Sequence, residues 1–177
     1  MRTVVWDGKS LAAYSKAPLS HPTGDDVVIF AVDDLLVGLI GDESSVAEVK
    51  ESLKRARGPL SKAIGVDAEL IVVKKDGSAR VIYKGVEAVY FGDQRKLAIG
   101  DNKKQALRLM SENPAASAAE VVQLATTDTV PDGYGINVFS FQHPGFRIVP
   151  GVGFRLADLR CLFDTAVPET EGARSDD

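Results

Sequence analysis

Few side chains in this sequence pair a nucleophile with a base that could activate it. Cys161 is the single cysteine among the 177 residues, and a lone thiol needs a neighbouring base to react. His21 and His143 each precede a proline in loop-like sequence, so neither is spaced to serve Cys161. We interpret Cys161 as a buried structural cysteine. Thr3 is the one candidate nucleophile near the start of the sequence.

The same composition disfavours several other function classes. Two histidines in unrelated loops, without a cysteine cluster, lack the spacing of metal ligands, and residues 151–153 are too short for a nucleotide-binding loop. A formal net charge of −4 disfavours nucleic acid, which would require a basic face. Residues 27–40 are the longest apolar region, but Asp33 and Asp34 interrupt them. We expect a cytoplasmic protein with no cofactor, metal, nucleic-acid or membrane partner.

Alternating and β-branched segments separated by turn signals predict many strands. Asp7-Gly8 and Asp76-Gly77 are the strongest hairpin signals. The near-continuous apolar composition around Asp33 predicts strands that are covered on both faces. The predicted strands span residues 2–6, 10–14, 27–32, 35–40, 69–74, 79–83, 86–91 and 133–141.

Three helices interrupt these strands. The predicted helices span residues 44–56, 102–112 and 117–127, with a further short helical segment at 60–64. Asp42 or Ser44 can cap the first, Asp101 the second, and Ser117 with Glu120 forms a capping box for the third. The apolar residues expected to face the core from the second and third helices are Ala106, Leu107, Met110, Val121, Val122, Leu124 and Ala125.

This order of elements differs from the regular alternation of a doubly wound sheet. Two sheets stacked face to face, with helices on both outer faces, would explain it and would cover the apolar strands on both sides. We predict one α+β domain over residues 1–165, followed by a flexible polar tail at 166–177.

Three stretches resemble the HslV and proteasome β-subunit family, particularly its short bacterial and bacteriophage members. They are residues 2–15 (RTVVWDGKSLAAYS), residues 35–42 (LLVGLIGD) with the helix after them, and residues 97–100 (LAIG) leading into the helix pair. The likeness covers roughly residues 2–141 and rests on the order and spacing of these stretches. It implies a four-layer αββα sandwich of the Ntn-hydrolase type.

The resemblance also implies a chemistry. In the family, an N-terminal threonine attacks a peptide carbonyl with its own α-amine as base, beside a lysine and an aspartate, and backbone N–H groups near a glycine turn hold the oxyanion. The matching positions depart from this pattern. Arg2 stands at the threonine position, and its guanidinium is neither nucleophile nor base.

The other matching positions depart in the same direction. Tyr14 stands at the aspartate position and Val28 at about the lysine position, and residues 101–103 replace a frequent Ser-Gly-Gly. We therefore expect no catalytic residue. Instead we expect a degenerate pocket of Arg2, Tyr14 and Val28, in which Arg2 and Tyr14 lie close enough for a hydrogen bond or a cation–π contact.

These departures favour a non-catalytic proteasome-like protein with a binding, structural or self-assembly role. We expect self-association through the first helix or the helix pair, and the fold also leaves room for a protein partner. A basic run on and after the first helix could face a partner, although charge runs usually form a solvated surface. The run comprises Lys50, Lys54, Arg55, Arg57 and Lys62.

Two alternatives remain. The chain could be a threonine-type peptidase in which processing after Arg2 exposes Thr3 as the N-terminal nucleophile. Arg2 argues against this, because removal of Met1 requires a small second residue, and the one-residue shift would turn Thr3 to the other face of the sheet. The chain could also be an unrelated α+β binding domain.

Overall fold

The computed structural model describes residues 2–15, 27–55, 68–90, 96–126, 134–143 and 145–148, with the side chains of Glu43 and Ser44 excepted. Within these ranges the chain forms two five-stranded antiparallel sheets and three helices. Two antiparallel sheets and three helices are as the sequence predicts, whereas the strands Leu97–Gly100 and Phe146–Ile148 are additional to the predicted ones. The expectations for the 60–64 helix, His21, Cys161 and the 166–177 tail lie outside the described residues.

The first sheet contains both ends of the described chain. Its strand order is β10-β9-β2-β1-β8. Its strands are β1 (Thr3–Trp6), β2 (Ser10–Ser15), β8 (Leu97–Gly100), β9 (Gly135–Ser140) and β10 (Phe146–Ile148). The predicted hairpin at Asp7-Gly8 is confirmed: Gly8 has a φ of 99°, and Oδ1 of Asp7 accepts hydrogen bonds from the N–H groups of Lys9 and Ser10, both at 2.7 Å.

The second sheet is a simple meander with the order β3-β4-β5-β6-β7. Its strands are β3 (Val27–Val32), β4 (Leu35–Ile40), β5 (Glu69–Lys74), β6 (Ala79–Tyr83) and β7 (Val86–Tyr90). Asp33 and Gly77 adopt positive φ values of 50° and 81° in two of the turns, as the predicted hairpins around them require.

The helices are α1 (Glu43–Arg55), α2 (Lys103–Glu112) and α3 (Ala118–Ala125). Asp42 accepts a hydrogen bond from the Ser45 N–H at 2.9 Å, and the capping box of Ser117 and Glu120 is present. The predicted cap at Asp101 is wrong. Asn102 is the N-cap of α2, and its side chain makes no capping hydrogen bond.

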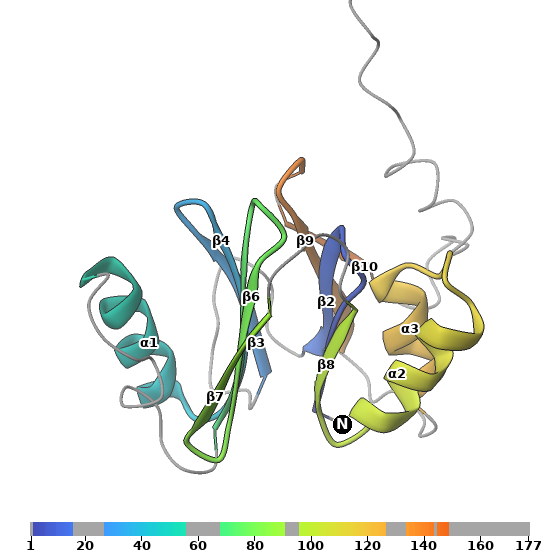
Figure 1. Cartoon of the computed structure of the whole chain (residues 1–177), viewed down its shortest axis with the longest axis horizontal. Coiled ribbons are helices and arrows are strands. Elements are labelled where there is room, and N and C mark those ends of the chain that lie inside the picture. Colours follow the sequence, from blue (N-terminus) through green and yellow to red (C-terminus); the bar gives the residue numbers. More distant parts are fainter. Residues whose placement is uncertain are drawn as a thin grey trace, which may run out of the picture.

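Three apolar clusters fill the spaces between helices and sheets. The first lies between the first sheet and α2 and α3, the second between the two sheets, and the third between the second sheet and α1. Figure 1 shows α1 beside the sheet containing β4 and β6, and α2 and α3 beside the sheet containing β2 and β9. Strands in both sheets are therefore covered on two faces, which explains their apolar composition.

Two leucines depart from the predicted helix faces. Leu107 is 42% exposed and Leu124 is 61% exposed, whereas Ala106, Met110 and Val122 are buried. These leucines were predicted to face the core because they are apolar residues within the helices, yet their positions lie outside the buried stripe. Both leucines therefore add apolar area to the exposed surface of α2 and α3.

Candidate functional site

The start of β1 and the junction between β8 and α2 hold each other through backbone and side chains. The Asp101 N–H donates to the Arg2 carbonyl oxygen at 2.7 Å, and the Arg2 N–H donates to Oδ2 of Asp101 at 3.3 Å. Nε of Arg2 lies 3.6 Å from the same oxygen, with both side chains about half exposed. The backbone of Arg2 is therefore engaged at both its donor and its acceptor.

Gly100 makes this close approach possible. Its φ is 96°, a conformation that residues with a Cβ rarely adopt. A Cβ at Gly100 would overlap the Arg2 carbonyl oxygen and would lie 2.7 Å from Cδ1 of Ile40. The glycine therefore lets β8 turn into α2 directly against Arg2.

Thr3 is buried in the same junction and is 3% exposed. Its Oγ1 accepts a hydrogen bond from the Asn102 N–H at 3.3 Å. The N–H of this N-cap residue is one of the donors at the start of α2 that have no partner within the helix, and the Thr3 hydroxyl satisfies it. Thr3 and Val5 are two residues apart on β1, so their side chains point to the same face of the sheet. Val5 lies in the cluster beneath the helices. The Thr3 hydroxyl thus points toward α2, where it accepts a hydrogen bond, and not into an open cleft.

The facing sheet adds a second set of polar contacts. Oε2 of Glu69, on β5, accepts a hydrogen bond from the Gly100 N–H at 3.0 Å and lies 3.9 Å from Nζ of Lys103. That Nζ is 3.8 Å from the centroid of the Tyr83 ring on β6. Sequence reasoning missed Glu69, whose only signal is a carboxylate at the start of an apolar strand.

We name this set of contacts the junction network. It consists of Arg2, Thr3, Glu69, Tyr83, Gly100, Asp101, Asn102 and Lys103. It contains acidic and basic groups, but each charge has an opposite charge or an aromatic ring within the network. Its one aliphatic hydroxyl, that of Thr3, is buried and hydrogen-bonded. The network can hold two sheets and a helix together, and it presents no activated nucleophile.

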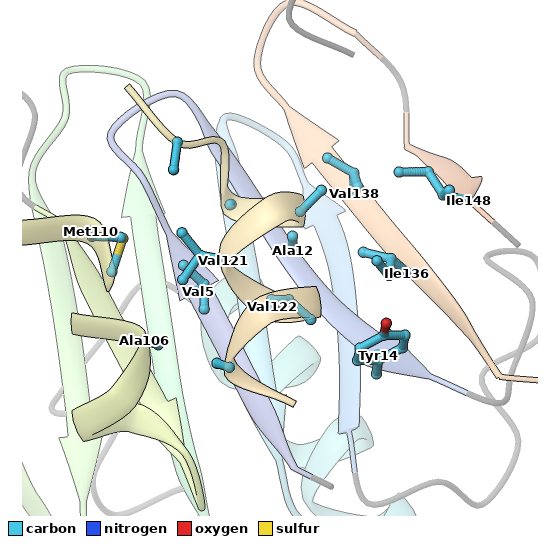
Figure 2. Packing of buried hydrophobic residues seen from close by; sticks show 14 residues of the cluster. Val5, Ala12, Tyr14, Ala106, Met110, Val121, Val122, Ile136, Val138 and Ile148 are labelled. Atoms are coloured by element: carbon cyan, nitrogen blue, oxygen red, sulfur yellow. The ribbon is translucent and has the colours of Figure 1, made fainter. Parts of the chain in front are cut away.

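Tyr14 does not join this network. It is 2% exposed and packs in the cluster beneath α2 and α3, with Ala12, Val122 and Ile136 among its members (Figure 2). Burial raises the pKa of the Tyr14 phenol. Tyr14 lies in the helix-side cluster, and the structure does not bring it together with Arg2. Arg2 contacts Asp101 instead.

Val28 lies in a third place. It is 8% exposed and belongs to the cluster under α1, on the outer face of the second sheet. The degenerate pocket of Arg2, Tyr14 and Val28 is therefore not formed. A shift of one residue reaches Val27 or Ile29, which both face the other sheet. Either position is aliphatic, so the shifted comparison also lacks a lysine.

A separate cavity opens at the far end of β3 and β4, where the Asp33-Asp34 turn faces the β9–β10 hairpin. Its volume is about 430 Å³, and its lining includes Phe139, Phe141, Lys75 and His143. The junction network lies at the other end, since Ile40 contacts Gly100 and pairs with Val27 at the opposite end of the β3–β4 ladder. The two features therefore form separate sites.

In the part of the chain that the structure describes, no three His, Cys, Asp or Glu side chains gather in a way that could hold a metal ion. Nor does any helix described there have the length and apolar character needed to cross a membrane.

Solved structures of similar arrangement include the eukaryotic HslV from Trypanosoma brucei. It shares 15% sequence identity and a TM-score of 0.47, over 78% of this chain and 99% of that chain. Identity and TM-score at this level assign neither a family nor an activity. No protein-family model matches the chain, and no curated protein matches it.

Proposed function

We propose that the chain is a non-catalytic protein of the proteasome-like Ntn-hydrolase type, a four-layer αββα sandwich like the short bacterial and bacteriophage members of that family. Its role is binding or self-assembly in the cytoplasm, without a cofactor or a nucleic-acid partner. The three matching sequence stretches support the family, and the placement of α1 against α2 and α3 on opposite outer faces supports the layering (Figure 1).

One observation carries the non-catalytic part of the proposal. Thr3, the candidate nucleophile, is 3% exposed, and its Oγ1 accepts a hydrogen bond from the Asn102 N–H. An N-terminal nucleophile requires an accessible hydroxyl and a free α-amine beside it. Here the residue before Thr3 is engaged by Asp101 through its N–H and its carbonyl oxygen. The contacts of the junction network therefore keep the Thr3 hydroxyl inaccessible and hold in place the residue whose removal would free the Thr3 α-amine.

The alternative is a threonine peptidase that uses Thr3 after processing. Cleavage between Arg2 and Thr3 would break the two backbone contacts of Arg2 with Asp101. It would also require Thr3 to turn away from α2, because its present strand face leads into the helix-side cluster. Nothing in the junction network compensates for these losses.

Hydrolysis of fluorogenic peptides by the full chain tests the proposal, with Thr3→Ala as the matched control. We expect the wild-type rate to equal both the buffer rate and the Thr3→Ala rate. Hydrolysis that Thr3→Ala abolishes, while Thr3→Ser retains it, would establish the peptidase alternative and overturn the proposal.

The surface of the helix pair supports the self-assembly role. Leu107 and Leu124 are the exposed large apolar side chains among the described helical residues, and interfaces concentrate apolar groups at their centre. On α1, by contrast, Arg55 pairs with Glu51 at 3.4 Å, and both are exposed. Lys50 lies 4.8 Å from the Phe30 ring of β3. These contacts favour a solvated face for the described part of α1, with Arg57 and Lys62 outside the described residues, and we propose the helix pair as the contact surface.

Light scattering at micromolar concentration tests this contact with Leu107→Glu and Leu124→Glu. We expect the wild type to exceed the 18.9 kDa of one chain and the double variant to have a lower mass. A wild-type monomer would replace self-assembly with a monomeric binding role.

A further inference from the structure

Strand β7 ends the second sheet with an exposed apolar edge. Among the described residues, β7 pairs only with β6. Val86 is 70% exposed and Val89 is 49% exposed, and they lie on opposite faces of the strand because their parity differs. An edge strand offers a row of backbone donors and acceptors, so a second strand can add to it.

Proteins usually protect such an edge with proline, with lysine or with another charge that faces outward. The β7 segment, VEAVY, contains no proline and no lysine. Its single charge, Glu87, pairs with Arg80 of β6 at 3.5 Å between Oε1 and Nη1, and the Glu87 side chain is only 17% exposed. The edge therefore presents backbone and valine, with its one carboxylate already paired inside the chain.

We propose that β7 pairs in antiparallel fashion with β7 of a second copy of this chain, about a twofold axis near Ala88. The two five-stranded sheets would then join into one continuous sheet. Over five residues the paired segment is about 17 Å long. This contact differs from that of the helix pair, and it does not depend on the catalytic state or the family of the chain.

The sequence of β7 fits a copy of itself. Antiparallel pairing about Ala88 places Val86 opposite Tyr90 and Glu87 opposite Val89 of the partner. No two like charges are opposed, which is the arrangement that destabilises cross-strand pairs. Parallel pairing would instead bring the two Glu87 side chains near each other. Glu87 and Arg80 carry opposite charges and pair at this edge, so the edge has no net charge that would select a charged peptide over a second copy.

This register makes position 89 a sensitive test. The twofold axis creates two equivalent pairs, each of Val89 on one copy and Glu87 on the other. Val89→Glu therefore introduces two like-charge pairs, whereas Val89→Lys introduces two opposite-charge pairs. Like-charge and opposite-charge cross-strand pairs each contribute up to about 1 kcal/mol. Val89 is half-exposed, so both variants are expected to fold, which circular dichroism verifies.

The experiment is analytical ultracentrifugation of the full chain over a concentration series, with Leu124→Glu as the control on the other surface. We expect Val89→Glu to raise the dissociation constant of one association step at least about fivefold relative to Val89→Lys. We expect Leu124→Glu to leave that step unchanged. Amide hydrogen exchange in β7 should slow with protein concentration in the wild type and in Val89→Lys.

Three results would overturn the inference. A wild-type chain that stays monomeric up to about 100 µM, a concentration at which even weak specific pairs form, has no β7 dimer. Equal dissociation constants for Val89→Glu and Val89→Lys would contradict the Ala88 register. Association that only Leu124→Glu disrupts would assign all contacts to the helix pair.

Discussion

The hydroxyl Oγ1 of Thr3 lies 3.3 Å from the backbone nitrogen of Asn102 and accepts its hydrogen bond. The contact joins the first residue of β1 to the start of α2, across 99 residues of sequence. Asn102 is the N-cap of α2, and its N–H has no acceptor within the helix, so the threonine supplies that acceptor from a distant strand. The residue type that suggests catalysis therefore has a structural role here.

Replacement of Thr3 should accordingly cost stability. Thr3→Ala removes the acceptor for the Asn102 N–H, so we expect a loss of about 1 kcal/mol in the free energy of unfolding. Thr3→Ser keeps the hydroxyl and should lose less. Urea denaturation measures both values. A Thr3→Ala variant as stable as the wild type would show that the hydroxyl contributes no such stabilisation.

Gly100 should be one of the least replaceable residues described. Its Cβ would overlap the Arg2 carbonyl oxygen, and its φ is 96°. We expect Gly100→Ala to lower the free energy of unfolding by about 3 kcal/mol or more, through overlap and backbone strain together.

Gly85→Ala is the matched control for this substitution. Gly85 also has a positive φ, 74°, but nothing lies within 4 Å of the added Cβ. Only the backbone term applies, so we expect a loss of about 1 kcal/mol. Equal losses at the two positions, measured by urea denaturation, would mean that the Arg2 contact does not constrain position 100.

Asp7 links the β1–β2 turn to α3. Its carboxylate accepts hydrogen bonds from the N–H groups of Lys9 and Ser10, from the Ser10 hydroxyl at 3.0 Å, and from the Ala118 N–H at 2.6 Å. Asp7→Ala leaves these donors without their acceptor, so we expect thermal and urea unfolding to show a loss of about 2–4 kcal/mol.

Asp76→Ala provides the comparison for Asp7→Ala. Asp76 also accepts hydrogen bonds within a turn, at 2.9 Å from the Ser78 N–H and 2.6 Å from its hydroxyl, but both of these bonds are exposed and local to the turn. We expect a loss below about 1 kcal/mol. A larger effect at Asp76 than at Asp7 would contradict the link between the first hairpin and α3.

The pH dependence of Tyr14 tests its placement under the helices. Burial raises the pKa of its phenol above the ordinary value of about 10. The folded state thus keeps the proton longer than the unfolded state, so the contribution to stability is complete below about pH 10 and is lost as pH rises through the folded-state pKa.

Alkaline absorbance titration should show one tyrosine ionising above the ordinary range, and Tyr14→Phe should remove that step. Tyr14→Phe should also reduce the loss of stability above about pH 10. A phenol at position 14 that titrates below about pH 10 would indicate a cation beside the ring. That result would restore the contact with Arg2 and the pocket expected from the sequence.

Local sequence patterns were sufficient to predict most of the elements. The hairpin at Asp76-Gly77 and the capping box at Ser117 are determined by neighbouring residues, and both occur as predicted. Strands β8 and β10 span only four and three residues and were missed. Strand β1 is as short as β8, but the Asp7-Gly8 hairpin signal after it made it predictable. The pairing of β8 depends on a partner far away in the chain, as β8 pairs with β1.

The candidate site was less predictable than the fold. Matching the sequence to the family's site positions predicted that Arg2, Tyr14 and Val28 lie together. Side chains at adjacent positions of a strand point to opposite faces of the sheet, so a small error in such a match moves a residue to the other face. Tyr14 accordingly lies beneath α2 and α3, and Val28 lies beneath α1. The partners of Arg2 and Thr3 come from the β8–α2 junction, and no pattern local to residues 2–15 could have identified them.

The most direct test of the central claim is the intact mass of the purified full chain after incubation with a peptide electrophile that reacts with N-terminal threonine. Because Thr3 is internal, buried and hydrogen-bonded to Asn102, we expect an unmodified chain that still contains Arg2 ahead of Thr3. A chain that begins at Thr3 and carries the electrophile on that residue would contradict a non-catalytic role and establish a threonine peptidase.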